Sequence, residues 1–95
     1  MKFEWDSAKA ESNLGKHGIS FDEATTVFGD PLAASRLDPL HEADEKRLVT
    51  LGHSSVNRLI VVAHVDRRDR IRIISARLAT GRERRTYEAG EEGHR

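Results

Sequence analysis

The chain has 95 residues, of which 34% are charged and 37% hydrophobic, so it is long enough for one domain with a modest core. It has no cysteine, which excludes a disulfide framework, and its five histidines fall in none of the paired spacings that bind metals. No apolar run approaches the ~20 residues of a membrane span, and the first residues do not form a signal peptide. We therefore expect a cytoplasmic protein with no membrane contact, no metal and no other cofactor.

The net charge is zero only in sum. Residues 1–45 carry ten acids against four bases, a net charge of −6, and residues 46–95 carry twelve bases against six acids, a net charge of +6. This asymmetry indicates a nucleic acid or another acidic partner for the second half. Two halves that neutralise each other across the fold would explain it equally well.

The first third of the chain predicts a strand and two helices. Residues 2–5 alternate polar and apolar side chains, as a short strand does. A helix is expected from Asp6 or Ser7 to residue 17, with Gly18 as its terminator. A capping box over residues 20–23 opens a second helix with one apolar face, and the turn at residues 29–31 ends it.

The rest of the chain predicts strands followed by a third helix. Strands are expected at 48–52, 59–65 and 70–76, with a weaker one around 33–37 that could pair with the first of them. A second capping box over residues 80–83 opens a helix that runs to about residue 89. The order β-α-α-β-β-β-α predicts a single α+β domain over residues 1–89, with helices packed on one face of a mainly antiparallel sheet. Residues 90–95 have no apolar side chain and are predicted to be a disordered tail.

Residues 71–87 (IRIISARLATGRERRTY) join the end of a strand to an arginine-rich helix. The N-terminus of that helix offers backbone donors to an anion, and guanidinium groups bind phosphate oxygens while staying protonated. We expect one anion site near this strand end, formed by Arg77, Arg82, Arg84 and Arg85. Two alternatives stay open: an ion pair from Arg77 to Glu4 or Glu23, and a solvated or protein-binding face for the helix arginines.

Four other side chains are candidates for proton transfer or phosphate binding, and each has a structural alternative. His64 lies inside an apolar strand, where a histidine is either a catalyst near neutral pH or a hydrogen-bonded core residue. His17 and Lys16 either bind phosphate or complement the dipole of the first helix. Tyr87 either stacks on a base or positions a phosphate through its hydroxyl, or it anchors the last helix to the sheet. Glu83 is expected to close the helix cap.

Taken together, these residues resemble the BrnT toxin family of bacterial type II toxin–antitoxin systems. The most specific matches are KHGISF at residues 16–21 and IRIISAR at residues 71–77, and the resemblance extends over residues 3–88. It implies a RelE-like fold and a ribonuclease activity that inhibits translation. It also implies a hetero-oligomer with a ribbon-helix-helix antitoxin of the BrnA type, which represses its own promoter. The antitoxin would read the DNA, so this chain would contact DNA only indirectly.

The implied reaction is a metal-independent attack of the RNA 2′-hydroxyl on the adjacent phosphorus, which needs a base, cations for the phosphoryl oxygens and an acid. The predicted catalytic residues are Arg77, Arg84, His64 and Tyr87. The predicted RNA- and phosphate-binding residues are Lys16, His17, Arg82 and Arg85. The alternative function is a non-catalytic protein- or RNA-binding subunit. A repressor acting alone is disfavoured because the sequence has no helix-turn-helix pattern.

Overall fold

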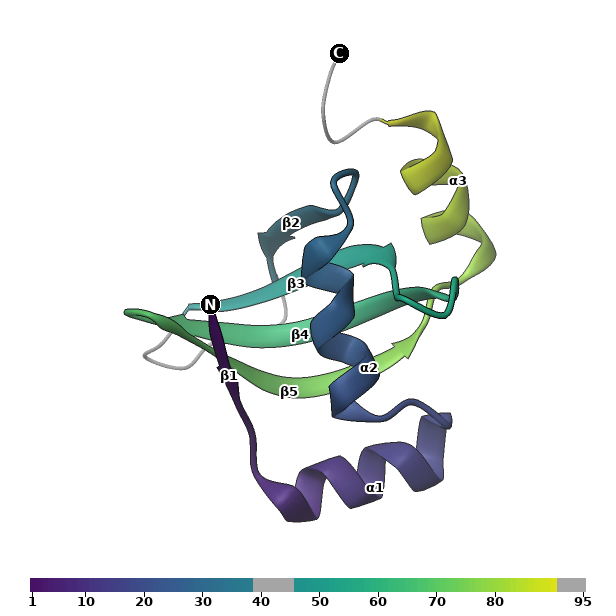
Figure 1. The fold of residues 1–95 in the computed structure, drawn as a ribbon. Helices are drawn as coiled ribbons and strands as arrows, with labels where there is room; N and C mark the ends of the chain where they lie inside the picture. Colours follow the sequence, from purple (N-terminus) through teal and green to yellow (C-terminus); the bar gives the residue numbers. More distant parts are fainter. Residues whose placement is uncertain (39–45, 91–95) are drawn as a thin grey trace.

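The computed structural model describes residues 1–38 and 46–90 (Figure 1). Its elements are β1 (Lys2–Glu4), α1 (Ser7–His17), α2 (Phe21–Thr26), the 3₁₀ turn η1 (Val27–Gly29), β2 (Ala34–Leu37), β3 (Arg47–His53), β4 (Leu59–Arg67), β5 (Arg70–Leu78) and α3 (Gly81–Ala89). The five strands form one sheet in the order β1-β5-β4-β3-β2, in which only the β1–β5 pair is parallel. The predicted α+β class is confirmed.

Two details differ from the predicted element order. The weak strand expected around residues 33–37 forms as β2, so four strands rather than three follow the first two helices. β2 pairs with β3 and is an edge of the sheet, and β1 is the other edge. Of the predicted tail, Gly90 ends α3 with a φ of 68°, and residues 91–95 lie outside the described part of the chain.

Local signals set the ends of the first two helices. Gly18 adopts a φ of 69°, and its N–H donates to the carbonyl of Leu14 at 2.9 Å, which closes α1. The Ser20 hydroxyl accepts the N–H of Glu23 at 3.0 Å and caps α2. The turn from Gly18 to Ser20 therefore joins α1 directly to α2, and both helices contact β5.

The core lies between these helices and one face of the sheet. Alternate residues of β4 and β5 point into it, as the two-residue period of a strand requires. They meet the apolar residues of the α1–α2 turn, α2 and η1; the buried cluster is Ile19, Phe21, Ala24, Val27, Ile60, Val62, Ile71, Ile73 and Ala76. Trp5 packs edge-on against Phe21 at 5.8 Å between ring centroids.

A buried amide joins α1 to the sheet. The Asn13 side chain donates to the carbonyls of Ile19 at 3.0 Å and Ala76 at 2.9 Å, and it accepts the N–H of Ala76 at 3.1 Å. It is 6% exposed, so these bonds replace those that water would make. Asn13 therefore fixes the position of an otherwise polar helix on β5.

The last helix lies apart from the other two. Figure 1 shows α3 beyond the ends at which β3 stops and β4 starts, away from α1. None of its residues is fully buried, and it contacts β3. Because α3 does not pack closely on the sheet, the face of β3 and β4 opposite the core is open toward α3.

Candidate functional site

A groove separates α3 from the second face of the sheet. One cavity of about 300 Å³ has Arg36 of β2, Val49 and Leu51 of β3 and Val61 of β4 on one side. On its other side are three residues at the start of α3, which are Thr80, Arg82 and Glu83. A second cavity of about 410 Å³ shares Ala34, Ser35, Leu51 and Thr86 with the first and extends to Tyr87. We call these two adjoining cavities the α3 groove.

An ion pair forms the end of this groove nearest β5. The two terminal nitrogens of Arg77 donate to the two carboxylate oxygens of Glu83, each at 2.9 Å. The same carboxylate accepts the N–H of Thr80 at 2.8 Å, while the Thr80 hydroxyl accepts the N–H of Glu83 at 3.1 Å. The hydrogen bonds from Arg77 lower the pKa of Glu83 to about 2, so the carboxylate is ionised at neutral pH.

This pairing corrects the predicted environment of Arg77. The alternative partners Glu4 and Glu23 bind other arginines: Glu4 pairs with Arg67, Arg70 and Arg72, and Glu23 with Arg58. The anion expected at the N-terminus of α3 is present, but it is the carboxylate of the chain itself. A phosphate at this point would compete with Glu83 for the guanidinium of Arg77.

The four arginines expected to converge do not share one site. Arg82 lines the α3 groove, and Arg77 borders it through Glu83. Arg84 and Arg85 are exposed on α3 and are not among the described residues that line the groove. The second arginine in the groove is Arg36, which sequence reasoning missed because it lies on the weakly predicted edge strand.

His64 is a hydrogen-bonded core residue. Its side chain is 2% exposed, with Nδ1 at 2.8 Å from Asp66 and Nε2 at 2.7 Å from the Thr50 hydroxyl. Phe28 packs edge-on against the ring at 4.9 Å. Burial lowers the pKa of His64, and the hydrogen bond that its ring donates to Asp66 opposes that change. His64 has no direct access to a ligand in the groove.

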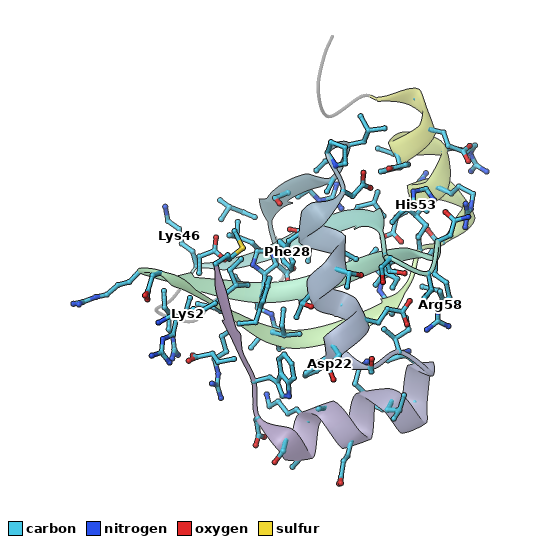
Figure 2. All side chains as sticks on the ribbon, in the orientation of Figure 1. Lys2, Asp22, Phe28, Lys46, His53 and Arg58 are labelled. Atoms are coloured by element: carbon cyan, nitrogen blue, oxygen red, sulfur yellow. The ribbon has the colours of Figure 1, made fainter. Side chains whose placement is uncertain are left out.

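Tyr87 holds α3 to the rest of the fold. Its hydroxyl donates to Oδ2 of Asp30 at 2.6 Å. Burial, and to a lesser extent this hydrogen bond, raises the pKa of Tyr87 to about 12. Its ring packs edge-on against His53 at 4.9 Å, beside α3 (Figure 2). The N–H of His53 donates to the same Asp30 oxygen at 2.8 Å. Sequence reasoning missed Asp30 and His53 because their contacts with Tyr87 span 57 and 34 positions.

Lys16 and His17 lie away from the groove. Both are exposed in the last turn of α1, and neither is among the described residues that line the groove. Gly18, which follows them, accepts a hydrogen bond from Arg58 at 3.0 Å through its carbonyl. The eight predicted site residues therefore occupy several places, of which the α3 groove holds Arg82 and Tyr87 and adjoins Arg77.

Over residues 1–38 and 46–90, no three or more His, Cys, Asp or Glu side chains are grouped so that they could hold a metal ion. Within these ranges no helix is both long and apolar enough to cross a membrane.

Comparisons with known proteins find a matching family and a similar solved structure. The family described as "Ribonuclease toxin, BrnT, of type II toxin-antitoxin system" has a model that matches residues 5–83. The 1.1 Å crystal structure of the Brucella abortus ribonuclease toxin BrnT is similar, with a TM-score of 0.62 and 26% sequence identity. The match covers 84% of this chain and 97% of that chain. A search of curated proteins finds no match.

Proposed function

Because this chain belongs to the BrnT family of ribonuclease toxins of type II toxin–antitoxin systems, we propose that it cleaves RNA in the α3 groove and thereby inhibits translation. The observation that carries the proposed location is the pair of exposed arginines in one cavity, Arg36 from β2 and Arg82 from α3. Two guanidinium groups on opposite walls can hold successive phosphates or two oxygens of one phosphate.

The remaining walls suit the rest of a nucleotide. Val49, Leu51 and Val61 give the cavity an apolar side on which a base or ribose can pack. At its end, Arg77 already binds a carboxylate, so a phosphate that displaces Glu83 would gain a guanidinium with two donors. The groove can therefore bind an RNA backbone through arginines that line or adjoin it.

The chemistry that fits these cations is attack by the 2′-hydroxyl on the neighbouring phosphorus, without a metal ion. The arginines would stabilise the charge that develops on the phosphoryl oxygens. We expect cleavage to continue at an unchanged rate in excess EDTA and to leave 2′,3′-cyclic phosphate ends. Activity that EDTA abolishes and magnesium restores would contradict the metal-independent reaction.

The variants that test the site are Arg36→Ala and Arg82→Ala, with Lys2→Ala as a matched control on the opposite edge strand. Loss of one cation that stabilises the transition state lowers a rate by ~10²–10³-fold, so we expect each groove variant to lose most cleavage while the control cuts normally. Arg77→Ala should also lose activity. The sequence predicts that Arg84 is catalytic, but Arg84 does not line the groove. Arg84→Ala therefore distinguishes the groove from a site that includes Arg84. Wild-type rates in both groove variants would overturn the proposed site.

A type II system includes an antitoxin protein. We propose that the partner is a ribbon-helix-helix antitoxin of the BrnA type, and that the complex represses its own operon with the antitoxin reading the DNA. Purified toxin should lose cleavage on adding the antitoxin, and only the complex or the antitoxin should bind operator DNA. Operator binding by the toxin alone would contradict this division of roles.

A further inference from the structure

The strand register places the Arg77–Glu83 ion pair on the groove side of the sheet. Arg77 of β5 lies opposite Val61 of β4, and Val61 lies opposite Leu51 of β3. Residues directly opposite each other in neighbouring strands point to the same face, and Val61 and Leu51 both line the first cavity of the α3 groove. Ala76, which precedes Arg77, is buried in the core on the other face. The Arg77 side chain therefore points to the groove side, where it binds the Glu83 carboxylate.

Glu83 is the one carboxylate among the described residues that line the first cavity. The other side chains there are arginines, hydroxyls and hydrocarbons. Arginines stay protonated and aliphatic hydroxyls are weak bases, so neither takes a proton from a substrate at neutral pH. Tyr87 lines the second cavity, and its pKa of about 12 keeps its hydroxyl protonated. Glu88 also lines the second cavity, to which neither Arg36 nor Arg82 belongs.

The Glu83 carboxylate is held in place but has room for one more donor. Its Oε1 accepts a hydrogen bond from Arg77 at 2.9 Å and one from the N–H of Thr80 at 2.8 Å. Within residues 1–38 and 46–90, Oε2 accepts one hydrogen bond, from Arg77 at 2.9 Å. An ionised carboxylate has about two lone-pair sites on each oxygen, and the Glu83 side chain is 22% exposed. Oε2 can therefore accept a hydrogen bond from a hydroxyl in the groove.

We propose that Glu83 is the general base of RNA cleavage, and that Arg77 passes from Glu83 to the scissile phosphate when RNA binds. This inference rests on the proposed ribonuclease function. In RNA the attacking 2′-hydroxyl and the phosphate that it attacks are attached to the same ribose, so the reaction needs a base directly beside a phosphate-binding cation. The Arg77–Glu83 pair provides both groups within hydrogen-bonding distance of each other.

The transfer of Arg77 makes Glu83 a stronger base once the substrate is bound. The hydrogen bonds from Arg77 are the largest cause of the low pKa of Glu83. When a phosphate takes over the guanidinium, the pKa of Glu83 rises from about 2 toward its ordinary value of 4.5. A carboxylate whose pKa lies nearer the working pH accepts a proton more readily. In the free protein the same ion pair keeps the base ionised and the start of α3 capped.

The bonds and protons balance in one displacement. The 2′-oxygen forms a bond to phosphorus as its proton moves to a carboxylate oxygen of Glu83, and Arg77 stabilises the charge that develops on the phosphoryl oxygens. The bond from phosphorus to the 5′-oxygen of the next nucleotide breaks, and that oxygen takes a proton from water. The products are a 2′,3′-cyclic phosphate and a free 5′-hydroxyl. Glu83 then gives its proton to the hydroxide that the water has become.

The experiment measures kcat and KM of RNA cleavage for wild type, Glu83→Gln and Glu83→Ala, with Glu11→Gln as a control of equal charge change. Glu11 is exposed on α1, on the other side of the sheet. General-base catalysis contributes ~10²–10⁴-fold, so we expect both Glu83 variants to lose at least ~10²-fold in kcat while the control cuts normally. Formate is a small carboxylate that fits the space left in Glu83→Ala, and it should restore part of the lost kcat there.

A binding measurement distinguishes catalysis from a merely structural role. Glutamine keeps the shape of Glu83 and an acceptor for the N–H of Thr80, but it removes the charge that competes for Arg77. Glu83→Gln should therefore bind an oligonucleotide with a 2′-deoxy ribose at the cleavage site at least as tightly as the wild type does. This binding also shows that the variant is folded.

The outcomes separate this inference from the proposed function. A wild-type kcat in Glu83→Gln overturns the assignment of the base, while loss of cleavage in Arg36→Ala and Arg82→Ala leaves the ribonuclease function standing. A lower kcat in Glu83→Gln that comes with weaker binding of the deoxy oligonucleotide, and with no effect of formate on Glu83→Ala, also overturns it, because Glu83 would then act only as a helix cap. A wild-type protein that cuts no RNA contradicts the proposed function, and the assignment of the base falls with it.

Discussion

The Glu83→Gln substitution tests whether the Arg77–Glu83 ion pair stabilises the start of α3. The glutamine keeps the shape and an acceptor for the N–H of Thr80, so it removes mainly the charge. The pKa of Glu83 falls from 4.5 to about 2, and at ~1.36 kcal/mol per unit the upper bound on the pairing is about 3 kcal/mol. The Arg77 side chain is 43% exposed, and screening by solvent reduces the expected loss to ~1–2 kcal/mol.

The assay is urea unfolding of both proteins at a series of pH values, with Glu88→Gln on the same helix as the control. Because the pKa of Glu83 is lowered in the folded state, its stabilising contribution is complete above the unfolded value near 4.5 and is lost as the pH falls toward about 2. The difference between wild type and Glu83→Gln should be largest at pH 7 and shrink below pH 4.5. A difference that is the same at pH 7 and pH 3 would refute this reasoning.

Two further predictions concern the fold that supports the groove. Asn13→Ala leaves three buried backbone groups at residues 19 and 76 without partners and should cost about 3 kcal/mol in urea unfolding; a loss under 0.5 kcal/mol would contradict its role. In Gly52→Ala, the new Cβ would lie 2.9 Å from Ala33 and should cost ~1–3 kcal/mol, whereas Gly15→Ala, with open space around it, should not lower the melting temperature. Equal effects of the two glycine variants would count against tight packing at Gly52.

Much of the fold could be predicted because its signals are local. The two capping boxes, Gly18 and the apolar run of β4 each lie within a few residues, and each predicted its element. The edge strand β2 was only weakly indicated, because three of its four residues are exposed and leave no apolar pattern. Pairing with β3 supplies the backbone hydrogen bonds that define it.

The site was harder to predict because it depends on contacts between distant elements. Glu83 was recognised as a cap and Arg77 as a strand-end cation, but their pairing depends on how the chain turns from β5 into α3. The entry of Arg36 into the groove depends on the register of β2.

The most direct test of the central claim is to map RNA ends in cells after brief induction of this chain, beside the same cells expressing Arg82→Ala. RNA cleavage in the α3 groove predicts new 2′,3′-cyclic phosphate ends within minutes of induction of the wild type, few of them with the variant, and arrested translation only with the wild type. Equal numbers of new ends with both proteins would contradict the groove as the site. The absence of new ends with the wild type, despite a folded protein, would contradict the ribonuclease itself.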